Sequence, residues 1–241
     1  MMKFYSYLKQ LRKFNGFLVT LNVMQHWKDY KEWKVQLNSK KMPIDLELPW
    51  LTISAKNYMD QFFDKLKTKD SRVFEYGTGG SSLYFSNKVS KVVGVEHDKE
   101  WFEKVVSTFK SKKQCNWEGH LCLPVKTEME LDFENPIDYG SSAQEFIGFD
   151  FSNYCKKIRE FDDEYFDAVL VDGRARPSCI VESVNKIKKG GILIIDNSER
   201  DYYYTNTGPF LKDFKLVVDS YSALICYPLL TKTNIFIKNA S

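Results

Sequence analysis

Hydrophobic positions follow two periods along the chain, and each period predicts one kind of element. Beyond residue 70, short apolar runs alternate with stretches in which apolar residues recur at helical spacing. The apolar runs predict strands at residues 72–76, 91–98, 165–173 and 191–197, with a weaker strand at 119–123. The intervening stretches predict helices at residues 80–89, 99–110, 151–161 and 177–188.

Strands that alternate with helices are typical of a doubly wound, mostly parallel sheet. The run at 165–173 is almost wholly apolar, as a central strand buried on both faces should be. Two later runs, 216–227 and 233–239, predict an antiparallel hairpin at the C-terminal end of the sheet. We therefore predict an α/β fold with a seven-stranded sheet over residues 50–241.

The first 49 residues predict a helical extension. An amphipathic helix is indicated by apolar residues spaced by four and three: Tyr7, Leu11, Phe14, Leu18 and Leu21, with Phe4 and Leu8 beside them. Further helices are predicted at residues 30–37 and 52–66, with a boundary at Pro43 and Pro49. The first helix is expected to pack on the main domain or form a homodimer, although its basic face also suits peripheral contact with a membrane.

Composition narrows the class of protein. An apolar content of 43% is ample for a large core, and a net charge of +3 predicts no nucleic-acid partner. Nine basic residues against three acids lie within residues 1–45, so a basic arm precedes a mildly acidic body. The five cysteines lack zinc or disulfide spacing, and the apolar stretch 17–24 is too short to span a bilayer and precedes no cleavage site. We expect a cytoplasmic protein without a signal peptide.

Acidic residues stand at the ends of four predicted strands, where open α/β sheets bind their ligands. These acids are Glu75, Glu96, Asp172 and Asp196. The first is followed by a glycine-rich turn, in which the missing Cβ atoms let a ligand approach the backbone. Glu96 follows Glu75 by 21 positions and can accept hydrogen bonds from both hydroxyls of a ribose. The alternative is that Glu96 only helps to cap the next helix.

The glycine-rich turn resembles the first motif of the class I S-adenosylmethionine-dependent methyltransferases, an acid followed by GxGG. Glu75, Gly77, Gly79 and Gly80 match that motif, and the acid after the second strand, VLVDG and GGILIIDN fall in family order. The resemblance implies S-adenosylmethionine as cofactor, with an acid near its methionine portion. The residues expected to bind it are Glu75, Tyr76, Gly77, Gly79, Gly80, Ser81, Glu96, His97 and Asp172.

The acceptor is expected beside the fourth and fifth strand ends. Candidate catalytic residues there are Asp172, Arg174, Arg176, Asp196 and Asn197. The two arginines can bind a carboxylate or phosphate of a small acceptor, or else pair with the acid-rich stretch 124–150. Asp172 with Asp196 and Asn197 also resembles the metal triad of catechol-type O-methyltransferases, which would imply Mg²⁺. We favour metal-free methyl transfer, because the RAR segment departs from the catechol-type pattern.

These features favour methylation of a small, anionic acceptor, most simply on oxygen. Residues 124–150 are expected to form an insert that caps the acceptor together with the N-terminal helices. Tyr202, Tyr203 and Tyr204 either stack on the acceptor or cover the sheet. Four alternatives stay open: an NAD-dependent oxidoreductase, an aminopropyl-type transferase, a nucleic-acid methyltransferase and a non-catalytic scaffold.

Overall fold

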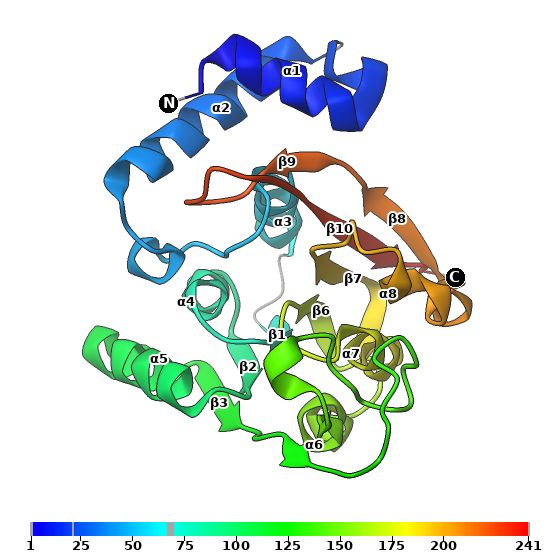
Figure 1. Ribbon diagram of the computed structural model, residues 1–241. Coiled ribbons are helices and arrows are strands. Elements are labelled where there is room, and N and C mark those ends of the chain that lie inside the picture. The colour runs from blue at the N-terminus through cyan, green and yellow to red at the C-terminus, as the bar shows by residue number, and fades with distance from the viewer. Residues whose placement is uncertain (1, 21, 67–69, 241) are drawn as a thin grey trace.

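A single large sheet forms the centre of the molecule (Figure 1). The computed structural model describes residues 2–20, 22–66 and 70–240. In this part of the chain the sheet has eight strands, in the order β3-β2-β1-β6-β7-β10-β8, with β9 paired to β10. Its strands are β1 (Arg72–Tyr76), β2 (Lys91–Glu96), β3 (Trp117–Leu121), β6 (Phe166–Val171), β7 (Ile187–Asp196), β8 (Phe214–Val218), β9 (Tyr221–Ala223) and β10 (Leu230–Lys238).

The sheet confirms the predicted mostly parallel α/β fold. β3, β2, β1, β6 and β7 run parallel, whereas β10 is antiparallel to both β7 and β8. The predicted strand at 216–227 is two strands, β8 and β9, and β9 is the eighth strand that the sequence did not predict. From β1 the chain first builds β2 and β3 on one side and then returns to build β6 and β7 on the other. The strand order therefore reverses between β1 and β6, where ligands bind in such sheets.

Helices cover both faces of the sheet, since its central strands are apolar on both. All six residues of β6 are buried, as are the last six of β7. The helices that follow β1 are α4 (Gly80–Ser86), α5 (Lys99–Lys112), α6 (Ser152–Lys156), α7 (Arg176–Ser183) and α8 (Tyr202–Thr205). The predicted helix 151–161 is α6 followed by a short 3₁₀ turn, Lys157–Glu160.

Helix α7 ends earlier than the sequence predicts. Its pattern suggested a helix up to Lys188, but β7 already begins at Ile187. The ammonium group of Lys188 lies 2.9 Å from a carboxylate oxygen of Asp167 on the neighbouring strand β6. Gly190 follows with a φ of 75°, a conformation that disfavours continued helix. Pairing with β6 thus outweighs the local helical pattern.

The N-terminal segment forms α1 (Phe4–Asn15), α2 (Val23–Ser39) and α3 (Ile53–Lys65), with 3₁₀ turns at Gly16–Thr20 and Pro43–Leu46. Tyr7 and Leu11 are buried as predicted, but α1 ends at Gly16, which has a φ of 60°. Leu18 lies beyond that turn and is 73% exposed, so its predicted place on the buried face is wrong. Leu21 lies outside the described residues.

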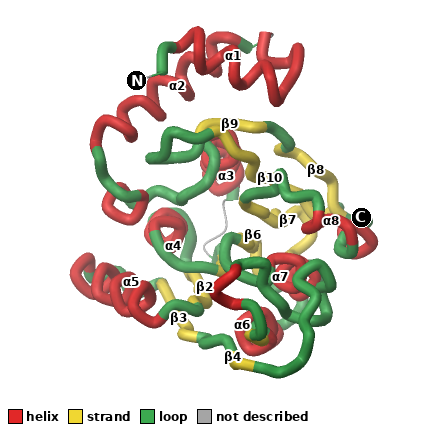
Figure 2. The backbone as a smooth tube through the Cα atoms, in the orientation of Figure 1, coloured by secondary structure: helices red, strands yellow, loops and turns green. Residues whose placement is uncertain are grey.

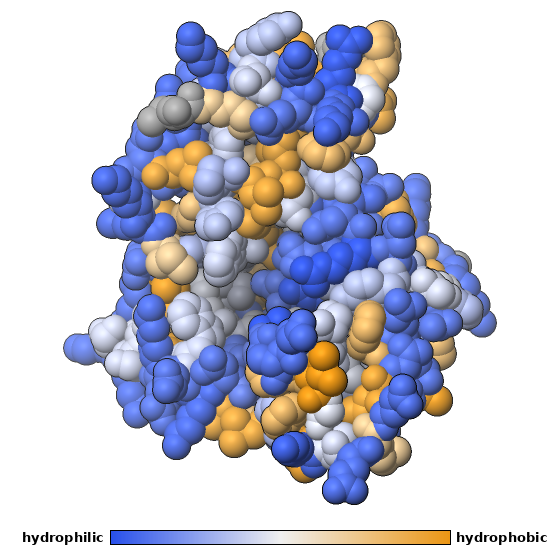
Figure 3. Space-filling view, in the orientation of Figure 1, coloured by the Kyte–Doolittle hydropathy of each residue, from blue (hydrophilic) through white to orange (hydrophobic). Residues whose placement is uncertain are grey.

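Helices α1 and α2 pack on the body of the same chain. The indole N–H of Trp33 donates to the carbonyl of Tyr227 (2.8 Å). The side chain of Asn15 exchanges two hydrogen bonds with the backbone of Tyr221, of 2.7 and 2.9 Å. Figure 3 shows hydrophobic residues where these helices approach the sheet domain, within an otherwise largely hydrophilic face. Packing within one chain is thus observed, while a homodimer and membrane contact stay predictions.

Residues 124–150 are largely loop, as predicted (Figure 2). They contain only a two-stranded ribbon, β4 (Val125–Lys126) with β5 (Phe149–Asp150), and a 3₁₀ turn at Gln144–Phe146. The ring of Phe146 contacts those of His97 and Phe151, at centroid distances of 5.2 and 5.3 Å. This insert therefore reaches the carboxyl end of β2. None of the described helices combines the length and apolar character needed to cross a membrane.

Candidate active site

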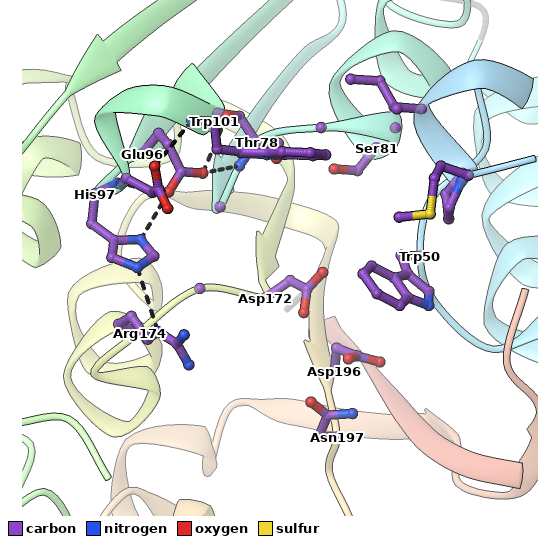
Figure 4. A pocket seen from close by; sticks show the side chains of 18 of the residues that line it. Trp50, Thr78, Ser81, Glu96, His97, Trp101, Asp172, Arg174, Asp196 and Asn197 are labelled. Carbon is purple, nitrogen blue, oxygen red and sulfur yellow. Dashed lines mark hydrogen bonds and ion pairs between the residues drawn. The ribbon is translucent and has the colours of Figure 1, made fainter. Parts of the chain in front are cut away.

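A cavity of about 530 Å³ opens at the carboxyl ends of β1, β2, β6 and β7 (Figure 4). Its size falls in the range of ~300–1,000 Å³ typical of small-molecule sites. Most of the predicted site residues line it: Gly77, Gly79, Gly80, Ser81, Glu96, His97, Asp172, Arg174, Arg176, Asp196 and Asn197. Glu75 and Tyr76 are absent from its walls.

The glycines of the turn meet different requirements. Gly77 has a φ of 90°, and a Cβ there would lie 3.2 Å from the backbone nitrogen of Gly173 on the adjacent strand end. Gly79 has a φ of 158° and faces the indole ring of Trp101. A Cβ on Gly80 would overlap the carbonyl oxygen of Leu48 and lie 2.8 Å from the carbonyl carbon of Pro43. The third glycine therefore makes room for the N-terminal segment, and only the first two shape the turn itself.

Glu75 and Tyr76 lie beneath the cavity. The side chain of Glu75 is fully buried and accepts a hydrogen bond of 2.7 Å from the hydroxyl of Ser81. Desolvation by burial raises the pKa of Glu75 to about 8. Tyr76 points to the opposite face of the sheet, where its hydroxyl donates to the carbonyl of Cys155 (2.8 Å). Neither side chain reaches the cavity, because consecutive strand residues alternate between faces and both faces are covered here.

Glu96 presents an ionised carboxylate at the end of β2. One oxygen accepts from the backbone N–H and the hydroxyl of Thr78, at 3.0 and 3.2 Å. The other accepts from the backbone N–H groups of His97 and Asp98, at 2.8 and 3.0 Å. Burial raises the pKa of Glu96, but hydrogen bonds from His97, Thr78 and Asp98 outweigh it and lower the pKa. Asp98 itself caps α5 by accepting from Trp101 N–H, so the capping role belongs to Asp98.

His97 links Glu96 to Arg174. Its Nδ1 lies 2.8 Å from Glu96 Oε1, and its Nε2 accepts from the Nε of Arg174 at 3.4 Å. Arg174 also contacts Glu145 of the insert, at 3.2 Å, and its side chain is 38% exposed. The ion pair between an arginine and the acid-rich stretch, predicted as one alternative, therefore forms at Arg174.

Arg176 is enclosed by oxygen atoms at the ends of β6 and β7. Its guanidinium donates to the carbonyls of Gly173, Asp172 and Asp196 and to the carboxylate of Asp172 (3.0 Å). It also lies 3.8 Å from the carboxylate of Asp196. With these donors engaged, the side chain joins two strand ends and has little capacity left for a ligand.

Asp172 and Asp196 converge on the floor of the cavity beside Asn197 (Figure 4). Desolvation and the charge of Asp196 raise the pKa of Asp172 well above its usual value. Desolvation likewise raises the pKa of Asp196, although Arg176 and the hydroxyl of Thr233 oppose the shift. Two carboxyl groups in such contact hold a proton between them more readily than either does alone.

The tyrosine run covers the sheet more than it faces the cavity. Tyr203 is buried and accepts from Arg200 (2.9 Å), while Tyr204 accepts from Asn234 (3.0 Å). Tyr202 instead contacts Ser142 of the insert, with 2.9 Å between the hydroxyl oxygens. Among the described residues, no group of three or more His, Cys, Asp or Glu side chains could hold a metal ion.

Comparison with known proteins gives a likeness in structure but none in sequence. No family model matches the chain, and no curated protein matches it. The structure of SMU.1697c from Streptococcus mutans, in complex with SAH, gives a TM-score of 0.51 at 12% identity, covering 76% of this chain and 97% of that one. A protein from Corynebacterium glutamicum gives 0.52 at 9% identity, covering 82% and 86%. The chain has the class I methyltransferase fold. An rRNA methylase from Streptococcus thermophilus is also similar, with a TM-score of 0.49 at 14% identity over 76% of this chain and 95% of that one.

Within this class I methyltransferase fold, several residues that line the main cavity were not predicted from the sequence. They are Met42, Pro43, Ile44, Trp50, Thr78, Asp98, Trp101, Gly173 and Leu224. The indole N–H of Trp101 donates to the carbonyl of Thr78 (2.6 Å), which places its ring beside the glycine turn. One signal could have found Trp101, since it lies one helical turn after the acid that caps α5. Trp50 and Leu224 come from distant segments, and no local pattern marks them.

Proposed function

We propose that this protein is an S-adenosylmethionine-dependent methyltransferase. The observation that carries the proposal is the charged carboxylate of Glu96, which lines the cavity at the end of β2, beside the glycine turn. An ionised acid in this place suits the two hydroxyls of a ribose. The fold that the chain shares with a structure in complex with SAH supports the same assignment.

The residues present fit the cofactor. Gly77 and Gly79 give the turn its positive φ angles and line the cavity, and the rings of Trp101 and Trp50 supply apolar walls for a nucleoside and a thioether chain. Glu75 supports the turn from below through Ser81. Bound in this cavity, the cofactor would supply an activated methyl group, so the chain needs no covalent nucleophile of its own.

The acceptor side is proposed at Asp172, Asp196 and Asn197. An acceptor hydroxyl on this floor can lose its proton to the ionised member of the aspartate pair. Arg176 fixes the two strand ends that carry the pair and balances its charge. This arrangement favours methylation on oxygen, because a carboxylate of the pair can remove a hydroxyl proton, and the volume of the cavity favours a small molecule.

We further propose that methyl transfer needs no Mg²⁺. The guanidinium of Arg176 already supplies a positive charge beside both carboxylates, at 3.0 Å from Asp172 and 3.8 Å from Asp196. A divalent ion would have to share this space with a fixed cation, at a cost in repulsion. Turnover of S-adenosylmethionine that survives EDTA would agree with the proposal, and turnover that EDTA abolishes and Mg²⁺ restores would refute it.

Calorimetric titration tests the proposed cofactor. The purified chain is titrated with S-adenosylmethionine, S-adenosylhomocysteine, decarboxylated S-adenosylmethionine and NAD, alongside a Glu96→Ala variant. We expect saturable binding of the first two ligands and a loss of affinity of about tenfold or more in the variant. Binding of NAD alone would favour an oxidoreductase, a preference for the decarboxylated cofactor an aminopropyl-type transferase, and binding of none a scaffold.

A further inference from the structure

A second, smaller cavity lies next to the first, between the N-terminus of α7, the segment after β7 and the insert. Its volume is about 110 Å³, and it shares Gly173, Arg174, Arg176 and Asn197 with the main cavity. The volume corresponds to roughly four water molecules at ~30 Å³ each. It therefore has room for a phosphate or carboxylate group.

The lining of this side cavity carries an excess of positive charge. Three arginines contribute to it, Arg174, Arg176 and Arg200, and no Asp or Glu among the described residues does. Two of the three are neutralised nearby, Arg174 by Glu145 and Arg176 by Asp172. Arg200 donates to the hydroxyl of Tyr203 (2.9 Å) and makes no ion pair with a carboxylate in the described chain. It thus leaves one positive charge without a counter-charge.

The backbone adds to this positive potential. Helix α7 begins at Arg176, and no side chain caps its N-terminus. Ala175, Arg176 and Pro177, the first residues of that end, all line the side cavity. The unpaired amides and dipole at a helix N-terminus favour an anion. The N-terminus of α7 and the positive charge of Arg200 therefore both act on the side cavity.

Hydroxyl groups also line the side cavity and can donate hydrogen bonds to an anion. Ser141 and Ser142 enter from the insert, and Tyr202 enters from α8. The Ser142 and Tyr202 hydroxyl oxygens lie 2.9 Å apart, which brings the insert to the side cavity opposite α7. Oxyanions accept several hydrogen bonds at once, and hydroxyl and guanidinium donors together provide them.

We propose that the side cavity binds an oxyanion group, a phosphate or carboxylate, of the methyl acceptor. This rests on the proposed function, because it takes the main cavity to hold the cofactor. The four shared residues join the two cavities, so an acceptor held by its oxyanion extends toward Asp172 and Asn197. Arg200 supplies the principal charge, and the insert selects acceptors that carry such a group.

The test uses anion binding to the full chain saturated with S-adenosylhomocysteine. Inorganic phosphate and, separately, acetate are titrated at constant ionic strength into the wild type, Arg200→Gln and Arg12→Gln. Arg12 is an exposed arginine of α1, so its variant matches the change in net charge without touching either cavity. We expect Arg200→Gln to weaken binding about tenfold or more, with Arg12→Gln within about twofold of the wild type.

The affinities of the three proteins for phosphate and acetate decide whether the side cavity binds an oxyanion. Binding of either anion with this dependence on Arg200 supports the proposal, and the tighter anion identifies the acceptor group as phosphate or carboxylate. Binding that S-adenosylhomocysteine abolishes, that ignores Arg200, or that falls equally in both variants overturns it. An unchanged affinity of Arg200→Gln for S-adenosylhomocysteine shows that the variant is folded. Phosphate binding without any S-adenosylhomocysteine binding would reject the proposed function but retain the oxyanion site.

Discussion

Glu75 and Glu96 stand at the ends of neighbouring strands, yet their carboxyl groups have opposite surroundings. Glu75 is enclosed, with one oxygen bonded to Ser81 and the other beside the space left by Gly94. Burial raises its pKa to about 8, so the group is mostly protonated at pH 7. Glu96 has a lowered pKa because hydrogen bonds from the His97 side chain and from the backbone N–H groups of Thr78 and Asp98 outweigh its burial. Of these two acids, only Glu96 presents a negative charge to the cavity.

We predict that the two carboxyl groups contribute unequally to cofactor affinity. Glu96→Gln should weaken binding of S-adenosylhomocysteine about tenfold or more, because it removes a charged acceptor from the cavity wall. Glu75→Gln should change the affinity by less than about threefold, since a neutral amide can still accept from Ser81. Calorimetric titration of both variants measures the difference. A larger effect at Glu75 would place that side chain in contact with the ligand.

A buried acid in α2 makes stability depend on pH. Burial raises the pKa of Asp29 to about 6, against hydrogen bonds from Gln25 and Asn57 that lower it. At pH values between the ordinary pKa of an aspartate and about 6, Asp29 retains a proton in the folded chain that it has lost in the unfolded chain. Stability contributed by this group is therefore highest in acid and falls as the pH rises to about 6.

Asp29→Asn is accordingly predicted to stabilise the protein at neutral pH. Both observed hydrogen bonds end on the same oxygen, at 2.7 Å from Gln25 and 3.2 Å from Asn57, and an asparagine retains that acceptor. We expect a gain of about 1–2 kcal/mol in the free energy of unfolding at pH 7, and a smaller gain at pH 4. Urea denaturation at both pH values measures it, with the exposed Asp64→Asn as control. An equal gain at both pH values would exclude the ionisation of Asp29 as its cause.

At the scale of elements, the 3₁₀ turn Pro43–Leu46 and helix α4 depend on one another. Gly80 lets the two approach, and Ile44 packs in a cluster with Leu83 and Phe109. Met42, Pro43 and Ile44 line the main cavity. The predicted division at residue 49 therefore cuts through a contact that shapes the ligand site.

Gly80→Ala should disrupt this contact. A Cβ at this position meets backbone atoms, which cannot move away as a side chain can. We expect a loss of about 1–3 kcal/mol in stability and weaker binding of S-adenosylhomocysteine. Gly208→Ala is the matched control, because no atom lies within 4 Å of its Cβ position. Similar thermal denaturation and titration curves for the two variants would show that the 43–48 segment does not rest on α4.

At the scale of the whole molecule, the main cavity joins three parts of the chain: the N-terminal segment, the sheet and the C-terminal segment around Leu224. A ligand at 100 times its Kd stabilises the folded state by about 2.7 kcal/mol. We predict that S-adenosylhomocysteine slows hydrogen exchange in residues 42–51 as well as in the turn 77–82. Mass spectrometry of the exchanged chain tests this. Protection confined to the turn would mean that the N-terminal segment is not part of the site.

Much of the fold could be predicted because short apolar runs in the sequence identify its central strands. β1, β2, β6 and β7 are largely apolar, and each has an acid at or beside its last residue. Glu96, Asp172 and Asp196 line the cavity at this edge of the sheet, whereas Glu75 lies beneath it. Contacts that depend on distant segments could not be predicted. The enclosure of Arg176 by carbonyl groups and the place of Trp50 in the wall follow from tertiary packing, which leaves no periodic pattern in the sequence.

The position of β10 has a consequence for how the protein is made. Synthesis proceeds from the N-terminus, so β7 and β8 both leave the ribosome before the strand that will lie between them. Until residues 230–238 appear, the outer edge of β7 has no partner, although β6 already pairs with its inner edge. An open, apolar strand edge is a site for pairing with another nascent chain. The interval between the synthesis of β7 and that of β10 is therefore the stage of translation at which this edge is exposed to such pairing.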